Sequence, residues 1–174
     1  PNVNPMTLMR HCLILPLALS ACFLFSHCAT GPSQTKLAPG QYEWHPERSS
    51  SGPLLVVVSI DDQMAYVYRN GVQIARSTVS TGRPGKETPT GVFTILQRKV
   101  EHESSIYKAA QMPYMQRLTW DGIPMHAGDL PGYPASRCSI PLPYYFSPKI
   151  YGPLGHGSTV VAPSKRCRPL SLSL

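Results

Sequence analysis

A histidine and two adjacent candidate nucleophiles lie close together in the second half of the sequence. Cys138 and Ser139 stand in "PASRCSIPLP", and His126 stands in "MHAG", ten residues before Ser136. An imidazole can take the proton of a thiol or hydroxyl, which can then attack a carbonyl carbon. The guanidinium of Arg137 stays protonated, so it can only favour a neighbouring thiolate electrostatically. We interpret His126, Arg137, Cys138 and Ser139 as candidate catalytic residues, and we leave open which of the last two is the nucleophile.

Metal chemistry is the other use that histidine and cysteine side chains suggest. His102, His126 and His156 are far apart in the sequence, and none forms a pair with Cys138 or with another histidine at a spacing typical of zinc sites. We therefore expect no metal and no cofactor.

The composition indicates which kind of element positions these residues. The chain has 174 residues, 42% hydrophobic and only 14% charged, with 19 prolines and 13 glycines. Such a chain is long enough for one domain with a real core, and it favours turns and short strands over long amphipathic helices. We predict a mainly β fold.

The folded domain is predicted to begin near Leu54 and to cover residues 54–163. Three strands are expected between Leu54 and Thr78, the last two joined by a hairpin turn at Asn70-Gly71, and a fourth over Val92–Leu96. A more polar insert follows, and further strands lead to His126. The segment "YYFSPKIYG" predicts a short helix and "GSTVVAP" a closing strand.

The two ends of the chain are predicted to lie outside that domain. Residues 1–29 contain the apolar run "CLILPLALSACFLF" and resemble a bacterial export signal. We leave open whether it is of the lipoprotein type; if it is, we favour Cys28 over Cys22 as the lipidated residue. Residues 30–53 are rich in Pro, Ser and Gly, which predicts a tether with at most one short strand near Tyr42. We expect an exported protein of the cell envelope, held to the membrane by a lipid anchor or by its signal. Residues 164–174 form a predicted tail, whose Cys167 is a candidate disulfide partner of Cys138.

The net charge of +7 raises the question of an anionic partner. No run of Lys and Arg is interleaved with aromatic residues, so we expect no nucleic acid and interpret the charge as a solvated basic surface. We expect a monomer.

Several separated motifs make the region from Leu54 to Pro163 resemble the L,D-transpeptidase (YkuD-type) catalytic domain. They are "VSTG" with "TPTGVF", "MPYMQRL", "DGIPMHAG" and "LPGYPAS", and they occur in the family's order. The resemblance implies a β-barrel or sandwich with one or two short helices. It also implies acyl transfer between peptidoglycan stem peptides through a cysteine acyl-enzyme, with those peptides as partners.

The family's nucleophile motif is altered in this sequence. The family has a serine followed by His-Gly-Cys, a small apolar residue and an arginine; aligned without gaps from Ser136, these positions hold Arg137, Cys138, Ser139 and Pro141. Read this way, the motif lacks its histidine, its thiol and its arginine. The four replacements predict weak or absent acyl transfer. His126 matches the family's upstream pocket histidine, and a surviving dyad requires it to lie within about 6 Å, twice hydrogen-bond reach, of Cys138 or Ser139.

Candidate substrate-binding residues surround these positions. They are Met125, Gly128, Tyr114, Tyr133 and Ser136. Two alternatives to a transferase remain open: a non-catalytic peptidoglycan-binding scaffold on the same fold, and a peptidoglycan hydrolase in which water replaces the acceptor amine.

Overall fold

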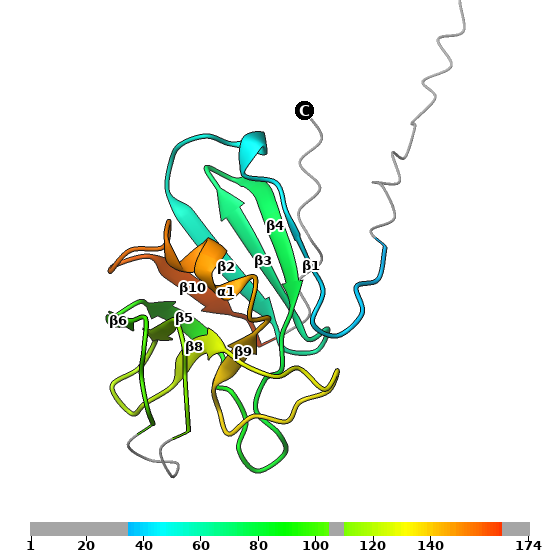
Figure 1. Cartoon of the computed structure of the whole chain (residues 1–174), viewed down its shortest axis with the longest axis vertical. Helices are drawn as coiled ribbons and strands as arrows, with labels where there is room; N and C mark the ends of the chain where they lie inside the picture. The colour runs from blue at the N-terminus through cyan, green and yellow to red at the C-terminus, as the bar shows by residue number, and fades with distance from the viewer. Residues whose placement is uncertain (1–34, 105–109, 165–174) are drawn as a thin grey trace, which may run out of the picture. The chain divides into compact units, whose positions relative to one another are not determined.

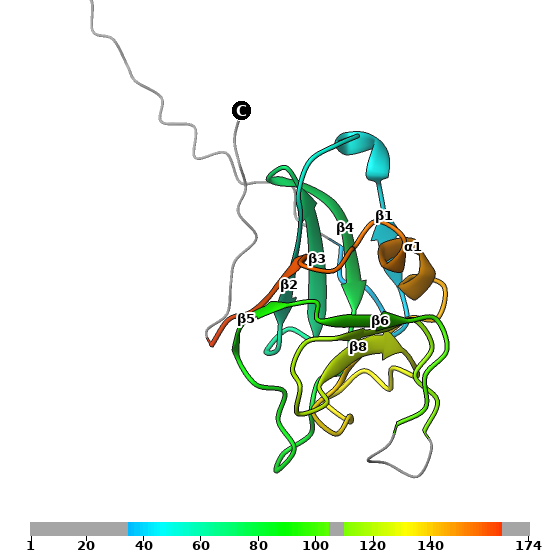
Figure 2. The ribbon, with the colours of Figure 1, turned by 90° about the vertical axis from the view of Figure 1, so that its left-hand side faces the viewer.

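Two β-sheets make up most of the domain in the computed structural model, which describes residues 35–104 and 110–164. Figure 1 shows both sheets and Figure 2 shows the smaller one, with β6 and β8 labelled, running across the larger one. The larger sheet contains β1 (Tyr42–Trp44), β4 (Val72–Thr78), β3 (Met64–Arg69), β2 (Leu54–Ser59), β10 (Thr159–Ala162) and β5 (Gly91–Thr94), in that order. The smaller contains β6 (Gln97–Lys99), β7 (Met115–Arg117), β8 (Pro124–Ala127) and β9 (Ile140–Leu142).

The larger sheet contains three strands that follow one another in the sequence and pair antiparallel. β2 pairs with β3 and β3 with β4, and Asn70 (φ 49°) and Gly71 (φ 79°) make the turn between the last two. Positive φ at both positions is what a two-residue hairpin turn requires. Along β3, Ala65 and Val67 are buried, so the alternation turns Tyr66 to the outer face.

The smaller sheet places residues 126 and 139 near each other. β8 and β9 are parallel neighbours, with Met125 opposite Ile140 and His126 opposite Pro141. Ser139 directly precedes β9. Because β8 and β9 run in the same direction, the chain must turn back after β8 to reach the start of β9. Residues 128–139 form this connecting loop.

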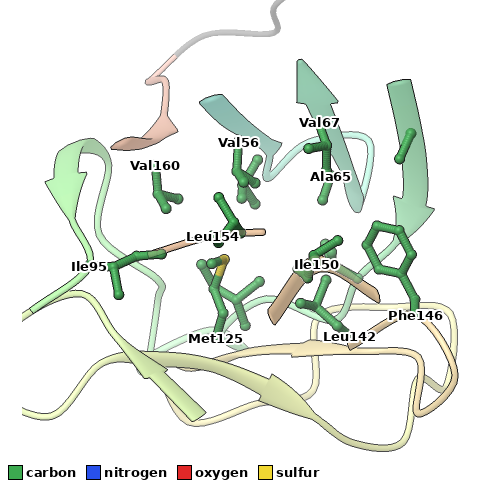
Figure 3. Packing of buried hydrophobic residues seen from close by; sticks show 14 of the residues in the cluster. Val56, Ala65, Val67, Ile95, Met125, Leu142, Phe146, Ile150, Leu154 and Val160 are labelled. Atoms are coloured by element: carbon green, nitrogen blue, oxygen red, sulfur yellow. The ribbon is translucent and has the colours of Figure 1, made fainter. Parts of the chain in front are cut away.

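The core lies between the two sheets (Figure 3). Met125 and Leu142 of the smaller sheet point toward Val56, Val67 and other residues of the larger one. α1 (Ser147–Tyr151) and the residues on either side of it close one edge of the core. Their apolar side chains, Phe146, Ile150 and Leu154, are fully or almost fully buried.

Most of the predicted elements are present. The fold is mainly β, as predicted, with the hairpin, a strand near Val92, the helix in "YYFSPKIYG" and the closing strand. Residues predicted as tether contribute more than a short strand: β1 pairs with β4, and η1 (Pro46–Arg48) follows it. The ordered domain thus starts before Leu54.

Some predictions concern residues outside the described ranges. The export signal, the lipidation candidates Cys22 and Cys28, and most of the predicted tail with Cys167 lie there. Within residues 35–104 and 110–164, no helix is long and apolar enough to span a membrane.

Candidate active site

His126 and Ser139 are hydrogen-bonded to each other. The distance from His126 Nε2 to Ser139 Oγ is 3.2 Å, and each residue is 8% exposed. This confirms the predicted proximity of His126 to the segment 136–139, and it selects the hydroxyl of Ser139 as the group in contact. His126 lies in β8 opposite Pro141 of β9, and Ser139 lies two residues before Pro141, so the parallel pairing of the two strands brings the pair into one region.

The other ring nitrogen of His126 determines the tautomer. Nδ1 lies 2.7 Å from the carbonyl oxygen of Ala127, which can only accept a hydrogen bond, so Nδ1 carries the proton. Nε2 of the neutral ring is then an acceptor and receives the hydroxyl proton of Ser139. This arrangement is that of a serine with a general base, the base being oriented by a third group.

The electrostatics keep the ring neutral. Burial lowers the pKa of His126 below its ordinary value of 6.5; the hydrogen bond to Ala127 opposes this shift, and the charge of His102 adds to it. A neutral imidazole at pH 7 is in the state required to accept a proton.

Cys138 occupies a backbone position that suits glycine. Its φ is +73°, a region that residues with a Cβ rarely adopt. This agrees with the gap-free alignment, which puts the family's glycine at 138. Cys138 is a half-buried free thiol, and among the described residues its sulfur has no hydrogen bond.

The loop backbone next to Ser139 is also held in place. The N–H of Cys138 donates to the carbonyl of Lys86 at 3.0 Å, and the Ser136 hydroxyl donates to the carbonyl of Ser139. Nothing in the described ranges accepts a hydrogen bond from the Ser139 N–H. That N–H is therefore available to an oxyanion at the reacting carbon.

Arg137 and Pro141 contribute differently from what the motif alignment suggests. Arg137 is exposed, and the Ser139 hydroxyl is hydrogen-bonded to His126. The site therefore keeps a base, His126, although residue 137 is not the histidine that the family motif has. Pro141 lies in β9 opposite His126 and is buried; its carbonyl accepts a hydrogen bond from Ser80.

The predicted substrate-binding residues lie in different environments. Met125 belongs to the core and is fully buried, so its assignment to substrate is wrong: alternation along β8 turns it away from the face of His126. Tyr114 packs on Tyr151 with ring centroids 5.6 Å apart. Gly128 lies near the dyad, since a Cβ there would lie 3.4 Å from Cε1 of His126.

A cavity of about 480 Å³ adjoins the nucleophile segment. Its walls include Ser136 and Pro141, which flank Ser139 in the sequence, and Asp129. Tyr133, 61% exposed, is fixed beside it, since its carbonyl accepts a hydrogen bond from the Ser80 hydroxyl. The remaining lining residues are Ser80, Leu130, Pro131 and Ala135.

Two contributors were missed by sequence reasoning. Ser80 and Thr88 anchor the loop through their hydroxyls, and their only sequence signal was their place within the motifs "VSTG" and "TPTGVF". For metals, the described part of the chain has no group of three or more histidine, cysteine or acidic side chains that could hold an ion.

Comparisons with known proteins identify the family and agree with the fold. The model of the L,D-transpeptidase catalytic domain family matches residues 53–160, more than half of the chain. The solved L,D-transpeptidase from Stackebrandtia nassauensis is 26% identical, with a TM-score of 0.60, over 68% of this chain and 58% of that one. Another from Mycobacterium smegmatis is 20% identical, with a TM-score of 0.60, over 66% and 60%.

A third similar structure is L,D-transpeptidase 3 from Mycobacterium tuberculosis in complex with a faropenem-derived adduct. It is 22% identical, with a TM-score of 0.60, over 64% of this chain and 60% of that one. This chain therefore spans about three fifths of the length of these structures. No curated protein matches it.

Proposed function

Because the chain belongs to the L,D-transpeptidase catalytic domain family, we propose that it transfers acyl groups between peptidoglycan stem peptides with Ser139 as the nucleophile. The observation that carries this proposal is the hydrogen bond from the Ser139 hydroxyl to Nε2 of His126. Cys138 is not the nucleophile in this proposal, since its sulfur has no hydrogen bond to that base among the described residues.

The reaction follows from these groups. Ser139 Oγ forms a bond to the carbonyl carbon of the donor stem's diamino acid while its proton passes to His126 Nε2. The N–H of Ser139 donates to the oxyanion. The bond to the terminal D-alanine then breaks, and the leaving nitrogen receives the proton from His126. An amine of a second stem attacks the resulting ester, and its proton returns through His126 to Ser139.

The cavity beside the nucleophile supports a peptide ligand. It adjoins Ser136 and Pro141, and its apolar wall contains Leu130, Pro131 and Ala135. Such a mixture of apolar surface and a few polar groups is typical of small-molecule and peptide sites.

Hydrolysis is a second candidate for the fate of the acyl-enzyme. An oxygen nucleophile makes an ester, and esters on serine enzymes are readily resolved by water under histidine catalysis. The ratio of the reaction with amines to the reaction with water is also smaller for an ester than for a thioester. The replacement of the family's thiol by Ser139 is the observation that favours this outcome.

Intact-mass spectrometry with faropenem tests the nucleophile. We expect the natural sequence to gain one acyl group, Ser139→Ala to gain none, and His126→Asn to react about 10²-fold more slowly or worse, because general-base assistance is worth at least that much. Cys138→Ser is the matched control and should label like the parent. Labelling that survives in Ser139→Ala or disappears in Cys138→Ser would show that Cys138 is the nucleophile. A parent that stays unlabelled yet binds stem peptides would favour the non-catalytic scaffold.

We also propose that the chain acts outside the cytoplasm, bound to the membrane through a lipid on Cys28 or through its signal. The apolar run before the Pro/Ser/Gly-rich segment supports this location. Palmitate labelling of the parent, Cys28→Ala and Cys22→Ala chains would identify the lipidated residue, and a cytosolic chain with its leader intact would contradict the proposal. We further expect a monomer, which light scattering would check.

A further inference from the structure

The loop of residues 82–88 contacts the nucleophile segment, residues 136–139, near both of its ends. Gly82 forms an isolated parallel bridge with Ser136, and the N–H of Arg83 donates to the carbonyl of Ser136 at 3.0 Å. At the other end of the loop, the carbonyl of Lys86 accepts from the N–H of Cys138. The two segments are thus joined at both ends by backbone hydrogen bonds.

Thr88 connects the loop and the nucleophile segment through its side chain. Its hydroxyl is buried, with the residue 5% exposed, and it donates to the carbonyl of Cys138 at 3.0 Å. The same oxygen accepts from the N–H of Gly82 at 2.9 Å. The carbonyl of Ser139 is a second, longer acceptor at 3.4 Å, so one hydroxyl contacts backbone groups on both segments.

At Gly82 the backbone of the loop approaches itself closely. A Cβ on Gly82 would lie 2.0 Å from the carbonyl oxygen of Lys86 and 2.6 Å from the backbone nitrogen of Thr88. The close approach of backbone to backbone is possible because residue 82 has no side chain. The position of the Thr88 hydroxyl is consequently determined by the tight turn before it.

The conformation of Cys138 requires an external restraint. A non-glycine residue at φ +73° is strained, and such strain persists only when the surroundings over-determine it. Both backbone polar groups of Cys138 are held, the N–H by Lys86 and the carbonyl by Thr88. This peptide leads directly into Ser139, so its orientation sets the direction of the Ser139 side chain.

We propose that Thr88 is a positioning residue: its hydroxyl holds the Cys138–Ser139 peptide in the orientation that brings Ser139 Oγ to Nε2 of His126. The mechanistic consequence rests on the proposed function, but the geometric claim does not. Without the hydroxyl, the Gly82 N–H and the Cys138 carbonyl lose a buried partner, and the strained peptide relaxes.

Thr78 provides a matched control. It is 8% exposed, its hydroxyl accepts from the N–H of Gly40 and donates to the carbonyl of Gln41, and it joins the chain before β1 to β4. Thr88→Val and Thr78→Val therefore remove the same kind of bridge, and we expect comparable losses of melting temperature. Thr88→Ser keeps the hydroxyl and should behave like the parent.

The first measurement is an NMR titration of His126, which needs no catalysis. The hydrogen bond from Ser139 stabilises the neutral ring, so its loss should raise the pKa of His126 and shift the Nε2 resonance. Ser139→Ala gives the reference for complete loss. We expect Thr88→Val to move toward this reference and Thr88→Ser and Thr78→Val to stay at the parent's values. A Thr88→Val spectrum with an unchanged His126 would overturn the proposal.

The second measurement is the rate of faropenem acylation. We expect a fall of about tenfold or more for Thr88→Val, because a displaced nucleophile loses its near-attack geometry, and parent-like rates for Thr88→Ser and Thr78→Val. An equal fall in Thr78→Val would show that general destabilisation is responsible. If the parent itself is not acylated, the proposed function fails while the titration still decides on Thr88.

A measurement on the parent chain covers the case in which Thr88→Val does not fold. A hydroxyl proton held by the Cys138 carbonyl should exchange slowly with solvent and should show a cross-peak in NMR spectra. Rapid exchange of the Thr88 hydroxyl proton, beside a slowly exchanging Thr78 hydroxyl proton, would contradict the proposal.

Discussion

At the scale of single residues, the site differs from the family motif at four positions. These positions are not equally important for the chemistry. The base in contact with the nucleophile is His126, which is present, so the replacements at Arg137 and Pro141 do not remove it. Ser139 changes the attacking atom from sulfur to oxygen. Of the four replacements, we therefore expect this one to affect the rate of acylation most.

Restoring the thiol alone should restore fast acylation. In Ser139→Cys the imidazole of His126 lies next to a thiol, which ionises far more readily than a hydroxyl and is the better nucleophile. We expect faropenem labelling about tenfold faster than in the parent or more, because a thiolate is the more reactive nucleophile. Arg137→His should leave the parent's rate almost unchanged, because residue 137 is exposed. Stopped-flow mass spectrometry measures both, and a rate that rises only in Arg137→His would reverse the assignment of the base.

Cys138→Gly should stabilise the domain. Relief of the positive φ at this position gains about 1 kcal/mol, since the left-handed region costs ~1–2 kcal/mol for residues with a Cβ and glycine's unfolded-state entropy offsets part of the gain. Urea denaturation measures the change. Cys138→Ala, which keeps a Cβ at the same φ, is the control and should show no such gain. Equal stability of the two variants would mean that the φ of residue 138 relaxes in solution.

The acylation rate should depend on pH through His126. Burial lowers its folded-state pKa below 6.5, so the ring is already neutral at pH 7 and the rate should be flat there. The rate should fall only when the pH drops through this lowered folded-state pKa, where protonation blocks Nε2. Stability changes with the same sign, since the unfolded chain binds the proton first: the contribution is complete above 6.5 and is lost as pH falls. His102, whose pKa burial also lowers, adds to the stability effect. A rate profile that instead rises steeply above pH 7 would exclude His126 as the base.

At the scale of secondary-structure elements, sequence patterns predicted the strands and turns whose formation depends on nearby residues. The Asn70-Gly71 turn fixed a hairpin, and the alternation around Tyr66 gave β3. β1 was not predicted as part of the sheet because its contacts are long-range: Tyr42 and Trp44 pack on Phe146 with ring centroids 5.2 and 6.1 Å away. A three-residue strand in a Pro/Ser/Gly-rich segment has no periodicity from which such packing could be read.

The same difference between local and long-range determinants applies to the site. The motif order placed His126 and Ser139 near each other, but the direction in which each side chain points depends on the parallel register of β8 and β9. That register puts Met125 into the core, against the sequence prediction. The role of the loop before Thr88 was also not predictable, because it arises from backbone hydrogen bonds between segments about 50 residues apart, as the Thr88–Cys138 bond shows.

Two glycines of that loop allow a test of its tightness. Gly82→Ala places a Cβ 2.0 Å from a backbone oxygen, whereas Gly85→Ala meets nothing within 4 Å and has only its positive φ of 78° to oppose it. We expect a loss of ~2 kcal/mol or more for the first and ~1 kcal/mol for the second. Thermal denaturation compares them. If Gly85→Ala proved the more destabilising, the close approach at residue 82 would not be an important constraint.

At the scale of the whole molecule, one core joins both sheets and the helical segment that precedes β10. Phe146 is fully buried in this core between residues of β1 and the rest of the cluster, while its neighbour Tyr145 is 82% exposed. The Ser139–His126 pair lies on the smaller sheet, whose inner face belongs to the same core. The site should therefore lose its geometry only when the domain as a whole unfolds.

Phe146→Ala tests this cooperative coupling. Removal of a fully buried aromatic ring should cost ~3–5 kcal/mol of unfolding free energy, whereas Tyr145→Ala should stay within ~0.5 kcal/mol of the parent because its ring is mostly in solvent. Urea titration followed by far-ultraviolet circular dichroism measures both. In the same titration, the His126 resonance reports on the site. Coincident transitions are expected in the parent and in Phe146→Ala, because a single core supports both sheets. A site that is lost at lower urea than the circular dichroism signal would mean that the smaller sheet unfolds by itself.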